Sequence, residues 1–336
     1  MTPRRIGVLG GGSWGTALAD VLARNGHVVK VWMRNPAVAA EINGRHSNER
    51  YLAGALLCET LIATTALDEA VADAEFVLSA CPSHAVRDVL DRARPSIRDP
   101  IVISSSKGIE IGSDLRMTQV IEESLGVVVT PRTVVLSGPS FADELVRCLP
   151  TAVVAASSPE ASAIEVQRIF QNGYLRVYTH TDVIGTELGG ALKNVIALAA
   201  GISDGLELGS NARAAIVTRG LAEITRLACR VGAQEATLAG LAGLGDLVLT
   251  CTGDLSRNRT VGLAIGRGER PDLVLGKMAQ VVEGVGTARA AHEIGVSLGV
   301  ELPITEAVYC ILYEEVEPRD ALAKLMARGP KPERWS

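Results

Sequence analysis

A lysine stands inside one of the most apolar segments of the chain. The stretch from Leu188 to Ile202 is interrupted only by Lys193 and Asn194, and its composition predicts a largely buried helix. Such a lysine usually extends its ammonium group to water, because burying an isolated charge is costly. Beside a cleft, however, desolvation can lower the pKa of a lysine until it suits proton transfer. Lys193 is therefore a candidate general acid/base.

A carboxylate further along the chain also lies in an apolar segment. Asp246 lies in the apolar run from Gly243 to Leu249. An unpaired carboxylate there would be costly to bury. Contact with Lys193 would relieve both charges, so we expect the two side chains to pair.

The segment from Ser256 to Arg259 has the composition of a phosphate site at a helix start. Ser256 can cap the helix, and free backbone amides together with the Arg257 guanidinium would bind an anion. Asn258 belongs to the same turn. The alternative is an exposed capped helix with two surface arginines.

A glycine-rich turn near the amino terminus predicts a dinucleotide site. Gly10, Gly12 and Gly15 fit GxGxxG between a strand-like run, Ile6 to Leu9, and a helix-forming run. In this pattern the first glycine permits the tight turn, the second lets the backbone approach a pyrophosphate, and the third lets the helix pack closely. The strand–turn–helix context favours this interpretation over a plain glycine turn.

The second predicted strand ends in Arg34 rather than in an acidic residue. An acidic side chain there would bond the ribose hydroxyl of NAD, whereas an arginine can pair with the 2′-phosphate of NADP. Arg34 therefore favours NADPH over NADH, although a solvated arginine at a strand end is a common alternative.

Three further polar segments follow predicted strands: 81–84, 104–108 and 138–142. Open α/β sheets bind ligands at the carboxyl ends of their strands, although each segment alone could be an ordinary turn. Lys107, among small residues, could meet an anionic substrate or a cofactor phosphate.

The elements that must position these residues change character along the chain. Up to Tyr178, short β-branched runs alternate with helix-length segments; after about Thr181 only helical patterns remain. We expect an α/β Rossmann-type doubly wound parallel sheet followed by an all-α C-terminal domain, divided as residues 1–180 and 181–336. Gly26 should end the first helix, and Thr65 should cap a later one. The expected strands are 6–9, 28–33, 61–64, 76–80, 101–104, 134–137, 152–155 and 175–178.

Composition excludes several classes of protein. The 336 residues are 47% hydrophobic and carry a formal net charge of -5, so the chain can build a full core and lacks the basic surface of a nucleic-acid binder. Its six cysteines form no CxxC pair and no metal-ligand spacing. We therefore expect no metal site, and reduced, mostly buried thiols.

Location follows from what the sequence does not offer. The amino terminus runs directly into the first predicted strand, which leaves no room for a signal peptide. The stretch from Leu188 to Ile202 carries Lys193 and is too short to span a bilayer. We expect a cytoplasmic protein with no membrane insertion.

Together these segments resemble the bacterial NAD(P)-dependent glycerol-3-phosphate dehydrogenases along essentially the whole chain. The segments that carry the resemblance are GGGSWGTALA from Gly10, SGPSFADE from Ser137, LGGALKNVIALAAGISDGL from Leu188, NARAAIVTRGLAE from Asn211, AGLGDLVLTCTGDLSRNR from Ala242, VVEGVGT from Val281 and ELPITEAVY from Glu301.

The resemblance implies specific roles. Lys193 would be the catalytic acid/base, held by Asp246, and dihydroxyacetone phosphate would be reduced to glycerol 3-phosphate with NADPH or NADH. A homodimer that supplies phospholipid synthesis is also implied. The loop from Glu41 to Ala55 is too variable for contacts to be carried over. Implied cofactor contacts are Ser13, Trp14, Arg34, Lys107, Ala142, Arg257, Val281 and Glu283; implied substrate contacts are Lys107, Gly138, Ser140, Lys193, Asp246, Ser256, Arg257 and Asn258.

Two other readings stay open at this point. Reductases that resemble the 6-phosphogluconate or ketopantoate enzymes also place a lysine after the cofactor domain. A nucleotide-sensing protein could use the same glycine turn without catalysis, although such a protein has no need to bury Lys193 and Asp246.

Overall fold

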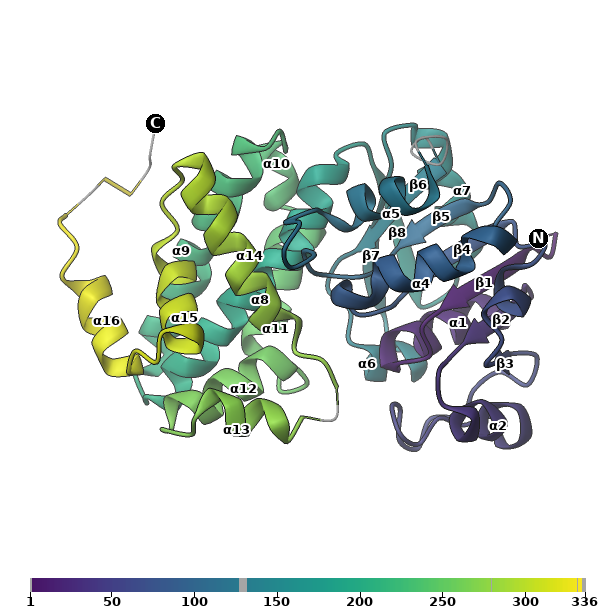
Figure 1. Cartoon of the computed structure of the whole chain (residues 1–336), viewed down its shortest axis with the longest axis horizontal. Coiled ribbons are helices and arrows are strands. Elements are labelled where there is room, and N and C mark those ends of the chain that lie inside the picture. The colour runs from purple at the N-terminus through teal and green to yellow at the C-terminus, as the bar shows by residue number, and fades with distance from the viewer. Residues whose placement is uncertain (1, 127–131, 279, 331, 334–336) are drawn as a thin grey trace.

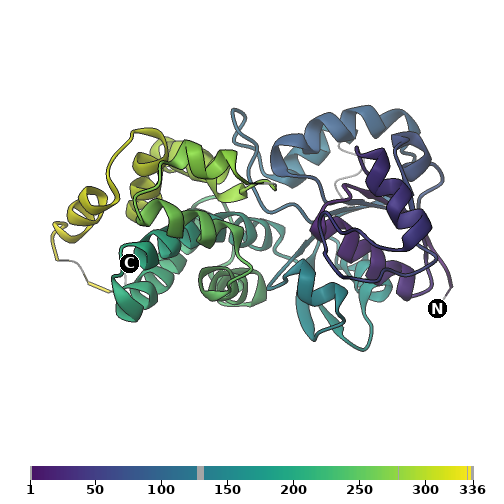
Figure 2. The same ribbon diagram turned by 90° about the horizontal axis from the view of Figure 1, so that it is seen from below.

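The structure is a computed structural model that describes residues 2–126, 132–278, 280–330 and 332–333. A twisted sheet flanked by helices makes up one half of the molecule, and a bundle of helices makes up the other (Figure 1). The view from below shows the two halves side by side along the longest axis (Figure 2).

The sheet has eight strands in the order β3-β2-β1-β4-β5-β6-β7-β8. All neighbouring strands are parallel except β6 and β7. The expected Rossmann-type sheet is confirmed, but a uniformly parallel one is not. The strand bounds are β1 Arg5–Leu9, β2 Val28–Trp32, β3 Ile62–Thr64, β4 Phe76–Ser79, β5 Ile101–Ser104, β6 Thr133–Ser137, β7 Thr151–Ala156 and β8 Leu175–His180.

The reversal at β7 has a local cause. The segment from Gly138 to Pro150 holds only the five-residue helix α6, so it returns the chain beside the carboxyl end of β6 without crossing the sheet. A parallel neighbour would require a longer crossover connection.

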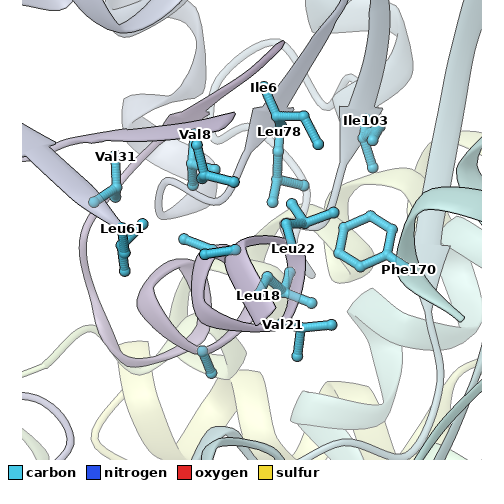
Figure 3. Close-up of a cluster of buried hydrophobic side chains, with 14 of the residues drawn as sticks. Ile6, Val8, Leu18, Val21, Leu22, Val31, Leu61, Leu78, Ile103 and Phe170 are labelled. Atoms are coloured by element: carbon cyan, nitrogen blue, oxygen red, sulfur yellow. The ribbon is translucent and has the colours of Figure 1, made fainter. Parts of the chain in front are cut away.

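Helices cover both faces of the sheet. Buried side chains of α1, α2, α6 and α7 pack on one face, and those of α3, α4 and α5 pack on the other. The first face forms the core shown in Figure 3, where Leu18 and Leu22 of α1 meet strand residues such as Val8 and Leu78. The helix bounds are α1 Ser13–Arg24, α2 Pro36–Arg45, α3 Leu67–Val71, η1 Ser83–Ala85, α4 Val86–Ala93, η2 Arg94–Ser96, α5 Met117–Leu125, α6 Ala142–Val146 and α7 Glu160–Phe170.

Two expectations about helix ends had different outcomes. Gly26 follows α1 with a φ of 83°, so the left-handed ending is confirmed. The prediction that Thr65 caps a helix is wrong, because α3 begins at Leu67 without a side-chain cap. The hydroxyl that binds this turn is one residue earlier, where Thr64 accepts a hydrogen bond from the Ala66 amide.

The second half is built around the long helix α8. Its Ala- and Gly-rich surface lets α9, α11, α12 and α14 pack directly against it. The bounds are α8 Val183–Gly205, α9 Gly209–Arg230, α10 Glu235–Leu238, η4 Leu241–Gly245 (a short π-helical turn), α11 Asp246–Thr252, α12 Arg257–Gly266, α13 Pro271–Gly276, α14 Glu283–Leu298, α15 Pro303–Tyr313 and α16 Pro318–Met326.

Helix α8 extends beyond the apolar stretch from Leu188 to Ile202 at both ends. It has 23 residues and is long and apolar enough to cross a membrane. In the described part of the chain no other single helix is, although the segments 235–252 and 257–266 pass the same test if the pair, bent by 48°, is counted as one span. Helix length alone therefore does not exclude a membrane span here. However, 89% of its apolar window is buried inside the protein, as expected of a core helix.

All six cysteines are free, but the expectation that most are buried is wrong. Cys81 and Cys251 are buried, whereas Cys148 and Cys229 are exposed. Cys148 lies in a turn with a φ of 59°, and Cys229 lies near the end of α9, so neither faces a core.

Candidate active site

A cleft of about 1000 Å³ lies between the two halves of the molecule. The glycine turn and the loops after β2, β4 and β5 form one wall, and residues of α8, α12 and the start of α14 form the other. The sheet half thus supplies most of the predicted cofactor residues, and the helical half supplies Lys193 together with Arg257, Val281 and Glu283.

The glycine turn has the geometry that a dinucleotide site requires. Gly10 has a φ of 113°, which favours glycine, and a Cβ at Gly15 would lie 1.9 Å from the Gly10 carbonyl oxygen. A Cβ at Gly12 would meet no atom within 4 Å, so a ligand can approach its backbone. Trp14 lines the cleft, and its buried indole N–H has no partner among the described residues. This wall therefore fits a dinucleotide at the start of α1.

Lys193 and Asp246 are in contact, as we expected from the apolar segments that surround each of them in the sequence. The Lys193 Nζ atom lies 2.5 Å from Asp246 Oδ1 and donates a second bond to Thr250 Oγ1 at 2.7 Å. Asp246 Oδ2 accepts a bond from Lys107 Nζ, also at 2.7 Å. One buried carboxylate therefore holds two ammonium groups, one from each half of the molecule.

The environment of Lys193 changes its acidity. Burial lowers the pKa of Lys193 to about 8; the Asp246 carboxylate opposes this shift and the Lys107 ammonium adds to it. A lysine of this pKa exchanges a proton readily near neutral pH.

Lys107 links the strand ends to the helical half. Its Nζ atom also donates to the Gly138 carbonyl oxygen at 2.8 Å and lies 3.4 Å from Ser140 Oγ. Asn194, next to Lys193, donates to the Lys107 carbonyl oxygen at 3.0 Å. The loops after β5 and β6 are thereby fixed against α8.

The start of α12 forms the predicted turn. Ser256 accepts a hydrogen bond from the Arg259 amide, so the predicted cap is present. The exposed Arg257 side chain lines the cleft and donates to the Val281 carbonyl oxygen at 2.7 Å. Asn258 is buried and bonds Asn194 Oδ1 and the Gly284 amide, so its side chain holds α12 against α8 and α14.

Two hydrogen-bonded contacts cross the cleft beside this turn. Glu283 accepts bonds from the Ser83 amide at 2.9 Å and the Ser83 hydroxyl at 2.5 Å. Ser13, in the glycine turn, donates to Gln280 Oε1 at 3.1 Å.

Most of the predicted site residues line this one cleft, and three do not. Asp246, 1% exposed, lies behind the two lysines; Gly138 presents its carbonyl to Lys107; and Gly15 packs under the glycine turn. Those lining the cleft are Gly10, Gly12, Ser13, Trp14, Arg34, Lys107, Ser140, Ala142, Lys193, Ser256, Arg257, Asn258, Val281 and Glu283.

Sequence reasoning missed Thr250 and Gln280, and it singled out the segment 81–84 without giving Ser83 a partner. Thr250 follows Asp246 by four residues, so helical spacing could have placed it on the same face. The position of Ser83 after a strand was a signal for the cleft, but its contact with Glu283 and that of Gln280 with Ser13 join residues distant in sequence. Within the described ranges no three His, Cys, Asp or Glu side chains gather as a metal site would require.

Comparisons with known proteins show the family of this chain. The profile described as "NAD-dependent glycerol-3-phosphate dehydrogenase N-terminus" matches residues 5–163, and the corresponding C-terminus profile matches residues 182–323. The "Glycerol-3-phosphate dehydrogenase [NAD(P)+]" of Geobacter metallireducens is 51% identical over 98% of this chain and 99% of its own length. That of Anaeromyxobacter dehalogenans is 53% identical over the same shares.

Solved structures give the same result. The crystal structure of glycerol-3-phosphate dehydrogenase from Coxiella burnetii superposes with a TM-score of 0.92 at 39% identity, covering 97% of this chain and 99% of its own. A ketopantoate reductase from Ralstonia eutropha JMP134 shares the fold at 14% identity and a TM-score of 0.60, covering 96% of this chain and 99% of its own. From its length-spanning profile matches and relatives, the chain belongs to the NAD-dependent glycerol-3-phosphate dehydrogenase family.

Proposed function

We propose that this protein is an NAD(P)-dependent glycerol-3-phosphate dehydrogenase in which Lys193 exchanges the proton of the reacting hydroxyl. The observation that carries the proposal is that Lys193, on the wall of the cleft opposite the glycine turn, is buried and has a lowered pKa. When bound, the nicotinamide supplies or accepts the hydride at C2 of the three-carbon phosphate.

Lys193 acts on the substrate oxygen. In the direction of reduction, the protonated Nζ donates a proton to the oxygen that develops on C2; in oxidation, the neutral amine takes that proton back. General acid/base catalysis of this kind contributes roughly a hundred- to ten-thousand-fold in rate.

Asp246 positions Lys193. It holds the ammonium from behind while Thr250 accepts a second bond, so the Nζ atom keeps its orientation toward the cleft. Because Lys107 shares the same carboxylate, the two cations stay close, and the excess positive charge favours the neutral form of Lys193.

The phosphate of the substrate binds at the start of α12. Arg257 is exposed in the cleft there, and the backbone amides of the first turn point outward from a helix N-terminus. Binding the phosphate at this end orients C2 toward Lys193, which is how remote binding energy serves a reaction at another atom.

One assay tests the proposal against its nearest rivals. Purified protein should oxidise NADPH or NADH when dihydroxyacetone phosphate is added and should not when ketopantoate is added. Reduction of ketopantoate instead would reassign the enzyme. Binding of cofactor without turnover of any three-carbon phosphate would favour a nucleotide sensor.

Several broader assignments accompany the proposal. Residues 1–180 bind the cofactor and residues 181–336 bind substrate and carry the catalytic lysine. Arg34, exposed in the cleft after β2, favours NADPH. We further infer a cytoplasmic homodimer without membrane insertion that feeds phospholipid synthesis; sedimentation of the purified protein tests the dimer.

A further inference from the structure

A loop that the family resemblance left unassigned lies on the wall of the cofactor cleft. The chain between α2 and β3 brings Arg50, Tyr51 and Leu52 to the cleft that Arg34 also lines. In Figure 1 this chain runs beside α2, next to the strands β2 and β3.

A buried asparagine anchors the loop to the glycine turn. The Asn48 amide donates to Thr16 Oγ1 at 2.9 Å and reaches the Gly11 carbonyl oxygen at 3.4 Å, and Asn48 is fully buried. Because Arg50 follows two residues later, its position is tied to the turn at which a dinucleotide would bind.

Arg50 and Arg34 both line this cleft and carry unneutralised positive charges. Both side chains are exposed, and neither makes an ion pair with a described carboxylate. Arg92, in contrast, is paired with Asp88 at 3.3 Å.

The nearby acidic side chains accept hydrogen bonds from groups within the same segment of the chain. Glu41 accepts bonds from the Ser47 hydroxyl and the Glu49 amide, and Glu49 accepts from the Gly54 amide. The Arg50 guanidinium lies 5.6 Å from the centre of the Tyr51 ring, a contact that leaves its N–H groups available.

We propose that Arg50, held by Asn48, forms with Arg34 a two-arginine clamp for the 2′-phosphate of NADPH. Two free guanidinium groups in a protein of net charge -5 are suited to a phosphate dianion, because each can donate two parallel hydrogen bonds. The inference rests on the proposed function, since it assumes that the cleft binds a nicotinamide dinucleotide.

Binding of a cofactor fragment tests the clamp without any turnover. Adenosine 2′,5′-bisphosphate carries the 2′-phosphate, and 5′-AMP lacks it. Calorimetric titration of Arg50→Ala should show adenosine 2′,5′-bisphosphate bound about tenfold to a hundredfold more weakly, with 5′-AMP affinity nearly unchanged. Arg50→Lys should recover part of the loss, because it restores the charge but not the planar fork.

Arg45→Ala is the matched control, because Arg45 is an exposed arginine of α2 that does not line the cleft. It removes the same charge and should change neither affinity by more than about twofold, since exposed charges farther away are screened. Equal losses for Arg50→Ala and Arg45→Ala, or no loss for Arg50→Ala, would overturn the clamp.

Steady-state kinetics separate the clamp from the proposed reaction. With dihydroxyacetone phosphate, Arg50→Ala and Arg34→Ala should each lower the ratio of kcat/KM for NADPH to that for NADH by about tenfold or more. A wild-type protein that turned over neither cofactor would refute the reaction, while the fragment titrations would still decide the clamp.

The anchoring role of Asn48 has its own test. If Asn48 acts by positioning Arg50, Asn48→Ala should weaken adenosine 2′,5′-bisphosphate binding in the wild type but add little in Arg50→Ala. Additive losses in this double-mutant cycle would show that Asn48 acts independently and would remove it from the clamp.

Discussion

At the scale of single residues, this site depends on one buried carboxylate that binds two ammonium groups and neutralises one of their two positive charges. Asp246 is 1% exposed and contacts both Lys193 and Lys107. Desolvation makes the neutral form of Lys193 accessible near neutral pH, while the carboxylate keeps the charged form from being lost altogether.

The pH dependence of the reaction follows from the pKa of Lys193, which is lowered to about 8. Reduction requires the protonated lysine, so its rate should fall as pH rises through about 8. Oxidation requires the neutral amine, so its rate should rise through the same range. Initial rates in both directions, measured across pH, test this. Lys193→Ala should abolish the pH dependence in both directions and lower the activity by about a hundred- to ten-thousand-fold. A Lys193→Ala protein with wild-type rates would eliminate the assignment.

Replacing Asp246 by asparagine should change both acidity and stability. Because the carboxylate raises the pKa of Lys193 against the effect of Lys107, its loss should move the pH profile to lower pH. The free energy of unfolding should fall by about 3–5 kcal/mol, as for other buried pairs that lose one partner. Urea denaturation measures this loss.

Asp99→Asn is the control, since Asp99 pairs with Arg132 at the surface with both side chains about half exposed. It should cost no more than about 1 kcal/mol. An unshifted pH profile in Asp246→Asn would mean that the carboxylate does not act through Lys193.

At the scale of elements, the phosphate end of the site depends on close packing between α8 and α12. A Cβ at Gly262 would lie 2.2 Å from the Leu198 carbonyl oxygen, and one at Gly201 would lie 2.1 Å from the Arg259 carbonyl oxygen. These glycines let the two helix backbones touch, so the start of α12 is placed at a set distance from Lys193.

Gly262→Ala should force α12 away from α8 and move Arg257 with it. We expect a loss of about 1–3 kcal/mol in the free energy of unfolding, as for overpacked cores, and a raised KM for dihydroxyacetone phosphate. Gly44→Ala is the control within a helix, because a Cβ there meets no atom within 4 Å. It should stabilise the fold slightly, by about 0.4–1 kcal/mol. Equal effects of the two variants on unfolding and KM would contradict the packing argument.

At the scale of the whole molecule, the site exists only because the sheet half and the helical half are held in a fixed relative position. Besides the Asp246 contacts, an ion pair with a buried carboxylate joins them: the partly buried Arg116, before α5, meets Glu187 of α8 at 2.7 Å. Glu187 also accepts bonds from the amide and hydroxyl of Thr118, so it holds the first turn of α5.

Arg116→Ala should leave the Glu187 carboxylate buried without its counter-charge. The expected cost is about 3–5 kcal/mol in the free energy of unfolding, measured by urea denaturation. Arg132→Ala removes the arginine of the surface pair with Asp99 and should cost no more than about 1 kcal/mol. If the two variants shifted the midpoint alike, the pair would not join the halves.

Much of this architecture could be predicted because it depends on patterns within short segments of the sequence. The period of the apolar residues located the strands and the change to helices, and burial costs alone singled out Lys193 and Asp246 as partners. Arg34 and the glycine turn were recognisable because each is defined by its position relative to a strand.

The tertiary structure decided what local patterns cannot encode. The reversal of β7, the link from Lys107 to Asp246, the contact of Ser83 with Glu283 and the anchoring of Arg50 by Asn48 all join residues through space. Composition and spacing determined which side chains carry charge into apolar surroundings. Which charges meet was determined by the packing of the helices and the crossing of the loops, because electrostatic and hydrogen-bond energies depend on distances that no sequence interval specifies.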